Sequence, residues 1–95
     1  MAESSEMEMI DQLVGGNMSI KLVCSFFDSI EYAQKVFDIY LDKGAISFHK
    51  DGEALEAWQS KEITRNLDEY VNNTEITISL TEHAIKNISD YNPHI

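Results

Sequence analysis

The stretch from Asn72 to Thr81 constrains the fold more than any other part of the sequence. Apolar residues at positions 76, 78 and 80 alternate with polar residues at 75, 77, 79 and 81. Because successive side chains of a β-strand point to opposite faces of its sheet, this alternation predicts a strand with one face in a core and the other outside it. The chain is therefore expected to build a sheet that is covered on one side.

A second strand is predicted for residues 18–27, where β-branched and aromatic residues dominate. Ile20, Leu22, Cys24 and Phe26 would lie on one face of this strand, and apolar residues also occur at 23 and 27 on the other. Apolar groups on both faces are typical of a strand in the middle of a sheet. We therefore expect residues 18–27 to form a central strand.

The sequence also predicts two helices, one within residues 28–43 and one over residues 82–89. Between residues 28 and 43, apolar residues recur every three or four positions, which indicates an amphipathic helix. Asp28 and Glu31 have the spacing of an N-cap and its N3 partner, and Gly44 follows the last apolar position. Residues 82–89 predict a short C-terminal helix, followed by a tail that contains Pro93.

Residues 45–59 admit two interpretations. A continuous helix over residues 53–71 has good intrinsic propensity, but it would split its apolar residues between two faces and make Trp58 an internal packing residue. A hairpin that turns at Asp51 and Gly52 leaves a coherent second helix that begins at Ser60. Counting outward from this turn gives the pairs Lys50 with Glu53, Phe48 with Leu55 and Ile46 with Ala57. We favour the hairpin, because these pairs match charged with charged and apolar with apolar residues.

With the hairpin, the elements follow the order β-α-β-β-α-β and end in a short helix. This is the order of a ferredoxin-like sandwich, an α+β fold with a four-stranded antiparallel sheet and two helices on one face. We assign residues 18–95 to this single α+β domain, since a chain of 95 residues has room for one core. Residues 1–17 are predicted to be an acidic tail or a short helix, loosely attached through Gly15 and Gly16.

The charge of the chain narrows its range of partners. Seventeen Asp and Glu residues against seven Lys and Arg residues give a formal net charge of -10. A field of this sign repels nucleic acid phosphates and anionic lipids and attracts basic proteins. The sequence also lacks an apolar run of the roughly 20 residues needed to cross a bilayer, and it lacks a signal-peptide pattern. We expect a cytoplasmic protein that binds neither nucleic acid nor membranes directly.

No pattern in the sequence predicts catalysis. The three histidines and Cys24 do not have the spacing of metal ligands. Gly15 and Gly16 are not followed by the Lys-Ser/Thr pair of a phosphate-binding loop. Cys24 lies between Leu22 and Phe26 on the core face of the predicted strand and is expected to act as a small hydrophobic residue. We predict that the protein is not an enzyme and uses no cofactor or metal ion.

The sheet face away from the predicted helices is the expected working surface. It would carry a few apolar groups among polar ones, which is typical of a surface that meets another protein or a second copy of the same chain. Alternatively, a terminal helix would fold back over it. The residues predicted to form this protein-binding face are Val23, Phe27, His49, Glu56, Trp58, Glu75 and Thr77.

The leading functional hypothesis is a non-catalytic, acidic protein-binding module. Inhibitors, antitoxins, immunity proteins and phage anti-defence factors, some of which resemble DNA in charge, are small acidic proteins of this kind. The partner would be a basic protein or one with an exposed apolar strip. The alternative hypothesis is a small-molecule-sensing or regulatory ferredoxin-like domain that forms a homodimer. Its ligand would produce a saturable rise in thermal stability.

Overall fold

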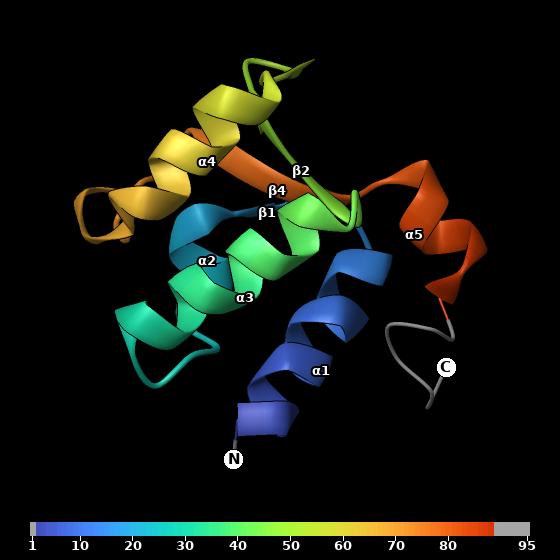
Figure 1. The fold of residues 1–95 in the computed structure, drawn as a ribbon, viewed down its shortest axis with the longest axis horizontal. Helices are drawn as coiled ribbons and strands as arrows, with labels where there is room; N and C mark the ends of the chain where they lie inside the picture. Colours follow the sequence, from blue (N-terminus) through green and yellow to red (C-terminus); the bar gives the residue numbers. More distant parts are fainter. Residues whose placement is uncertain (1, 89–95) are drawn as a thin grey trace.

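The computed structural model describes residues 2–88, and their side chains from residue 5 onward (Figure 1). Its elements in chain order are α1 (Ala2–Val14), β1 (Met18–Ser19), α2 (Ile20–Cys24), α3 (Ile30–Asp42), β2 (Ile46–Lys50), β3 (Glu53–Ala54), α4 (Ala57–Arg65), the 3-10 helix η1 (Leu67–Glu69), β4 (Ile76–Leu80) and α5 (Glu82–Lys86). The strands form one four-stranded antiparallel sheet in the order β1-β4-β2-β3. The predicted α+β class with a four-stranded antiparallel sheet is confirmed.

The alternating strand that the sequence predicts most clearly is β4, and it lies in the middle of the sheet. It pairs with β2 over its whole length, from Ile76 opposite Lys50 to Leu80 opposite Ile46. Its three apolar residues are buried, whereas Thr77 and the neighbouring serine at position 79 are half-buried on the other face. The predicted division between a core face and an outer face is therefore confirmed for this strand.

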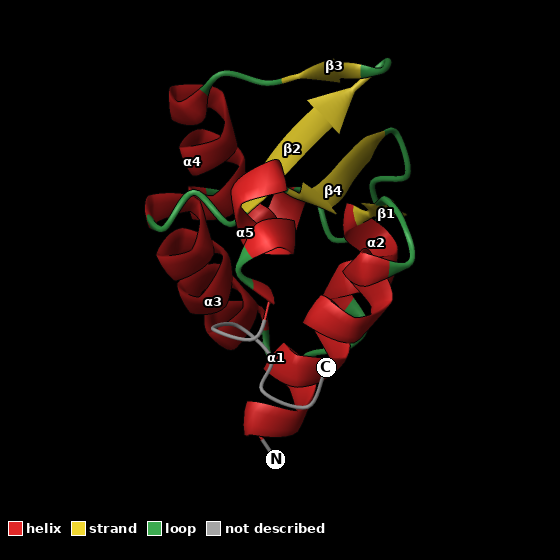
Figure 2. Ribbon diagram, turned by 90° about the vertical axis from the view of Figure 1, so that its right-hand side faces the viewer, coloured by secondary structure: helices red, strands yellow, loops and turns green. Residues whose placement is uncertain are grey.

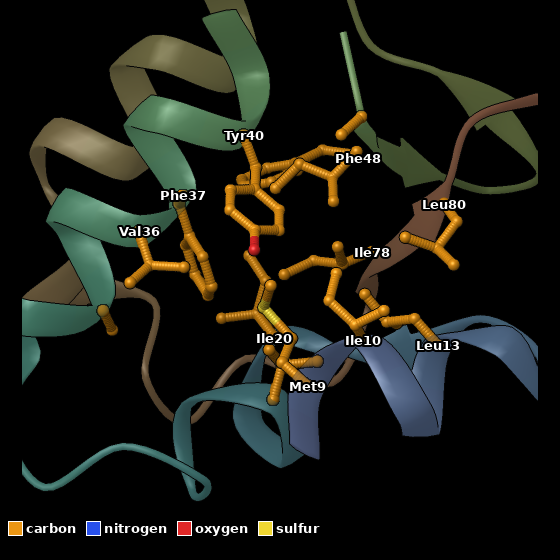
Figure 3. Packing of buried hydrophobic residues seen from close by; sticks show 14 of the residues in the cluster. Met9, Ile10, Leu13, Ile20, Val36, Phe37, Tyr40, Phe48, Ile78 and Leu80 are labelled. Carbon is orange, nitrogen blue, oxygen red and sulfur yellow. The ribbon is translucent and has the colours of Figure 1, made fainter. Parts of the chain in front are cut away.

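Helices cover the core face of the sheet. Figure 2 shows the strands gathered on one side of the molecule and α3 and α4 on the other. Side chains from α1, α3, β2 and β4 point toward one another in the space between (Figure 3). The rings of Phe37 and Phe48 meet edge to face, with centroids 6.0 Å apart, which joins α3 to β2 at the centre of this core.

The prediction of a long first strand is wrong. Only Met18 and Ser19 pair with β4, at the edge of the sheet, and the next five residues form α2. The Ser19 hydroxyl accepts a hydrogen bond from the backbone N–H of Leu22 and so caps this helix. The helical spacing buries Ile20 and Val23 together, whereas a strand would have put them on opposite faces. Packing against the core has overridden the strand propensity of this segment.

Because β1 is a short edge strand, β2 and β4 take the two central positions of the sheet. The sequence predicts the first strand in the centre of the sheet, so the position of this strand in the sheet differs from the prediction. The finer ferredoxin-like assignment stays a prediction, since the structure supports only the antiparallel α+β arrangement.

The expectation that the N-terminal segment is loosely attached is also wrong. Of the two alternatives for this segment, the structure has the helix, and Met9, Ile10 and Leu13 of α1 are buried in the common core. The Tyr40 hydroxyl of α3, which points from α3 toward α1 in Figure 3, donates a hydrogen bond of 2.7 Å to Glu6. The helix thus contributes buried side chains to the core of the fold.

Both interpretations of residues 45–59 are partly right. Asp51 and Gly52 have φ values of 55° and 82°, the left-handed conformations of a type I′ turn, and Lys50 pairs with Glu53 as predicted. The Leu55 N–H still donates to the Phe48 carbonyl at 2.8 Å. The chain then leaves the sheet and α4 begins at Ala57, so the predicted pair of Ile46 with Ala57 and the helix start at Ser60 are wrong.

The helices predicted within residues 28–43 and 82–89 are present as α3 and α5. α3 is capped by Ser29 instead of Asp28, since the Ser29 hydroxyl accepts from the Tyr32 N–H at 3.1 Å. Gly44 follows this helix at a φ of 69°, as its predicted end requires. The predicted end of the C-terminal helix at residue 89 and the tail beyond it lie outside the described residues. None of the helices within residues 2–88 is long and apolar enough to span a membrane.

Candidate protein-binding site

Two of the seven predicted binding residues belong to the core. Val23 in α2 is fully buried. Phe27 is buried too, with its ring 5.6 Å from that of Tyr32 and 6.0 Å from that of Phe37. The placement of these residues on an open sheet face is wrong, because it depended on a strand where the structure has α2 and the turn that follows it.

His49 and Thr77 lie where the sequence places them. They are paired across β2 and β4 on the outer face of the sheet, and both are half-buried. The His49 Nε2 atom lies 2.8 Å from the Ser47 hydroxyl and 2.9 Å from the Ser79 hydroxyl, and the two hydroxyls are 3.3 Å apart. These three groups satisfy one another, so the cluster stabilises the pairing of the two strands without a ligand. Within the described part of the chain, no large exposed apolar side chain lies on β2 or β4.

Trp58 and Glu56 lie at a different place, where the hairpin passes into α4. The Glu56 backbone N–H donates to the Gln59 side-chain oxygen at 2.9 Å, which fixes the first turn of the helix. Trp58 points outward from this turn and is 65% exposed, more than any other large hydrophobic residue in the described part of the chain. A tryptophan in this state leaves a large apolar surface in contact with water.

Trp58 stands beside a groove of about 320 Å³, which we call the Trp58 groove. Its lining combines the apolar or aromatic side chains of Leu55, Trp58, Ile63, Tyr70 and Ile76 with the polar side chains of Lys50, Gln59, Glu62 and Asn73. Since the Ile76 side chain is on the core face of β4, the groove opens on the helix side of the sheet. The Trp58 groove and the His49 cluster are therefore on opposite sides of the sheet, and the single predicted face is divided into two surfaces.

One acidic residue, Glu62, lines the Trp58 groove. The exposed acids Asp51, Glu56 and Glu69 each follow or precede a lining residue in the sequence, whereas Glu75 belongs with Thr77 to the outer face of the alternating stretch. Lys50 is the base in the lining of the groove. Lys61 adjoins Glu62 in the sequence, but its charge is paired with two aspartates. A groove that combines apolar side chains with an acid, in a protein of net charge -10, suits a partner segment that carries both apolar and basic side chains.

Cys24 has the character expected of a structural thiol. It is half-buried in α2, and burial raises its pKa from 9.0 to about 11. A thiol with such a pKa is protonated at neutral pH and is a poor nucleophile. Among residues 2–88, no three His, Cys, Asp or Glu side chains are grouped so that they could hold a metal ion.

The sequence did not reveal that Leu55, Ile63 and Tyr70 join Trp58 at one groove. The hairpin interpretation and the helix interpretation of residues 45–59 each account for part of this set. The side chains come together because the hairpin ends at Leu55 and a helix begins at Ala57. No protein-family model, curated protein or solved structure in the comparisons matches the chain.

Proposed function

We propose that the protein is a non-catalytic, acidic protein-binding module that holds a basic partner at the Trp58 groove. The observation that carries this proposal is the 65% exposure of Trp58 at a groove that combines apolar side chains with the acid Glu62. Burial of this indole by a partner would remove apolar surface that the free protein leaves in water.

Tryptophan is well suited to anchor such a complex. Aromatic residues that fill a partially formed pocket contribute much of the binding free energy at interfaces, whereas the surrounding polar contacts contribute little. The Trp58 side chain projects from the first turn of α4, which the capping contact at Glu56 holds in place. The anchor is therefore presented on an ordered backbone, which lowers the entropy lost on binding.

The net charge of the protein indicates the chemistry of the partner. A protein with a net charge of -10 attracts basic surfaces over distances comparable with the Debye length, about 8 Å at physiological salt. Charges on the rim of an interface mainly accelerate association. We infer that the partner presents lysine or arginine side chains around an apolar side chain that packs on Trp58. Inhibitors, antitoxins, immunity proteins and phage anti-defence factors are the classes that fit such a module.

The experiment compares two variants that each remove a large exposed side chain. Trp58→Ala is expected to weaken binding of a short amphipathic peptide of lysine and leucine by about 2 kcal/mol or more, since an aromatic anchor is lost. Ile85→Ala is the control, because Ile85 is 58% exposed on α5 and does not line the groove. Calorimetric titration measures both affinities, and thermal melting checks that both variants remain folded.

A second pair of variants tests the negative charge of Glu62 in the groove. Glu62→Gln is expected to slow association and to reduce its dependence on salt, whereas Glu8→Gln, an exposed acid on α1, should change neither by as much. Equal loss of affinity in Trp58→Ala and Ile85→Ala would show that the peptide binds the acidic surface without using the groove, and the proposal would then fail.

A further inference from the structure

A second groove of about 480 Å³ lies between α3 and α4, and it collects basic residues. Its lining consists of Gln34, Lys35, Asp38, Lys61, Thr64 and Arg65, which we call the α3–α4 groove. It therefore holds three of the seven Lys and Arg residues of the chain and one carboxylate. In a protein of net charge -10, this is a local reversal of the prevailing sign. It shares no lining residue with the Trp58 groove.

Cross-helix contacts hold the two walls of this groove together. The Gln34 side-chain amide donates to the carbonyl oxygens of Thr64 and Arg65, at 3.1 Å each. These carbonyls belong to the last turn of α4, where the helix dipole places negative partial charge. The Gln34 amide reduces this negative charge, which would otherwise repel an anion in the groove.

Lys61 binds the carboxylate of the groove. Its ammonium nitrogen lies 2.6 Å from an oxygen of Asp38 and 2.6 Å from an oxygen of Asp42. The hydrogen bonds to Asp38 and then Asp42 raise the pKa of Lys61 above its usual value, so it stays charged at neutral pH. Asp38 and Asp42 share this one ammonium, so the charge of Asp38 is reduced but not cancelled, and an incoming anion depends on the other two cations of the groove.

Lys35 and Arg65 are the cations that remain. Among the residues whose side chains are described, 5–88, neither takes part in an ion pair. Arg65 offers a planar set of N–H donors that matches two oxygens of one anion, and Lys35 adds a second positive charge from the facing helix. The volume of the groove also exceeds the space that a single phosphate group needs.

We propose that the α3–α4 groove binds the phosphate group of a small molecule, with Arg65 and Lys35 as its ligands. Arg65 holds two phosphate oxygens and Lys35 holds a third from the opposite wall. Phosphate is the favoured anion because its charge and its several oxygens use both cations at once. This site is independent of the Trp58 groove and gives a defined location to the ligand-sensing alternative.

The test is an NMR titration of the full chain, first with inorganic phosphate and then with adenosine monophosphate. We expect saturable shifts of the backbone amides at positions 34, 35, 64 and 65. Arg65→Ala should weaken binding about tenfold, as expected for the loss of a charge-assisted, two-point contact. Arg65→Lys, which keeps the charge and the complement to the helix dipole, should give an intermediate loss.

The matched control is Lys86→Ala, which lowers the net charge by the same unit on α5. It should leave the affinity for phosphate nearly unchanged. Tighter binding of the nucleotide than of inorganic phosphate would assign the groove to a phosphate ester, and equal binding would assign it to the phosphate group alone. An equal loss in Lys86→Ala and Arg65→Ala, shifts spread over the whole surface, or no saturable binding would each overturn the proposal.

Discussion

Neighbouring residues of β4 experience opposite surroundings. Ile78 is fully buried against α1 and α3, whereas the Thr77 side chain lies on the outer face opposite His49. The sequence predicts this difference correctly, because a period of two leaves no other way to bury the three apolar residues of the strand.

A charge at these two positions should therefore have very different effects. Ile78→Asp is expected to lower the free energy of unfolding by about 3 to 5 kcal/mol, since it buries an unpaired carboxylate and leaves a cavity. Thr77→Asp should cost about 1 kcal/mol or less, because the new carboxylate reaches water. Urea denaturation of both variants measures the difference, and equal midpoints would contradict the assignment of the two faces.

Cys24 allows a second test at the scale of one residue. A pKa of about 11 leaves roughly a hundredfold less thiolate at pH 8 than a pKa of 9.0 would. The higher basicity of the thiolate offsets part of this loss, so alkylation by iodoacetamide should be roughly tenfold slower in the folded protein than in urea. Equal rates in both states would show that Cys24 is not shielded.

The same shift predicts a dependence of stability on pH. Burial favours the neutral thiol, so its contribution to stability is fully present below pH 9.0 and is lost as the pH rises from 9.0 through about 11. A Cys24→Ala variant should lose less stability than the wild type over this interval.

Helices and strands can be predicted from the sequence where the spacing of apolar residues follows a single periodicity. The helix α3 and the turn at Asp51 and Gly52 could be predicted because apolar spacing and turn chemistry act within a few residues. The segment that forms α2 could not, since its β-branched residues favour a strand and only the capping bond at Ser19 and the shared burial of Ile20 and Val23 select a helix. The Trp58 groove was missed for a related reason, because it requires the chain to change from strand to helix at Glu56.

The N-terminal helix offers a prediction at this scale. Removal of residues 1–17 is expected to abolish or strongly reduce cooperative unfolding, because Met9, Ile10 and Leu13 are part of the core. Loss of the contacts of Glu6 with the Tyr32 and Tyr40 hydroxyls, at 3.3 and 2.7 Å, would add to the effect. A truncated protein that melted like the full chain would show that α1 contributes nothing to stability.

A smaller change separates the apolar contribution of α1 from its polar one. Glu6→Ala should lower the free energy of unfolding by about 1 to 3 kcal/mol, since it leaves two tyrosine hydroxyls without this acceptor. Glu8→Ala is the control on the exposed side of the same helix, where a change of less than about 0.5 kcal/mol is expected.

At the scale of the whole molecule, the charge could be known from composition but its arrangement could not. The net charge of -10 predicts a basic partner, whereas the position of Glu62 in the Trp58 groove and of the bases between α3 and α4 depends on how the elements pack. Both grooves are formed by side chains that are distant in sequence. The sequence of one chain provides no signal for such contacts before the fold is known.

If Trp58 is an exposed anchor that a basic partner covers, its own fluorescence reports the binding. Trp58 is the single tryptophan, so its fluorescence comes from the proposed site alone. We predict emission typical of a solvated indole in the free protein and a saturable blue shift when the lysine and leucine peptide is added. A glutamate and leucine peptide with the same apolar face should produce no shift. Blue-shifted emission in the free protein, or emission unchanged by a peptide that calorimetry shows to bind, would contradict the account.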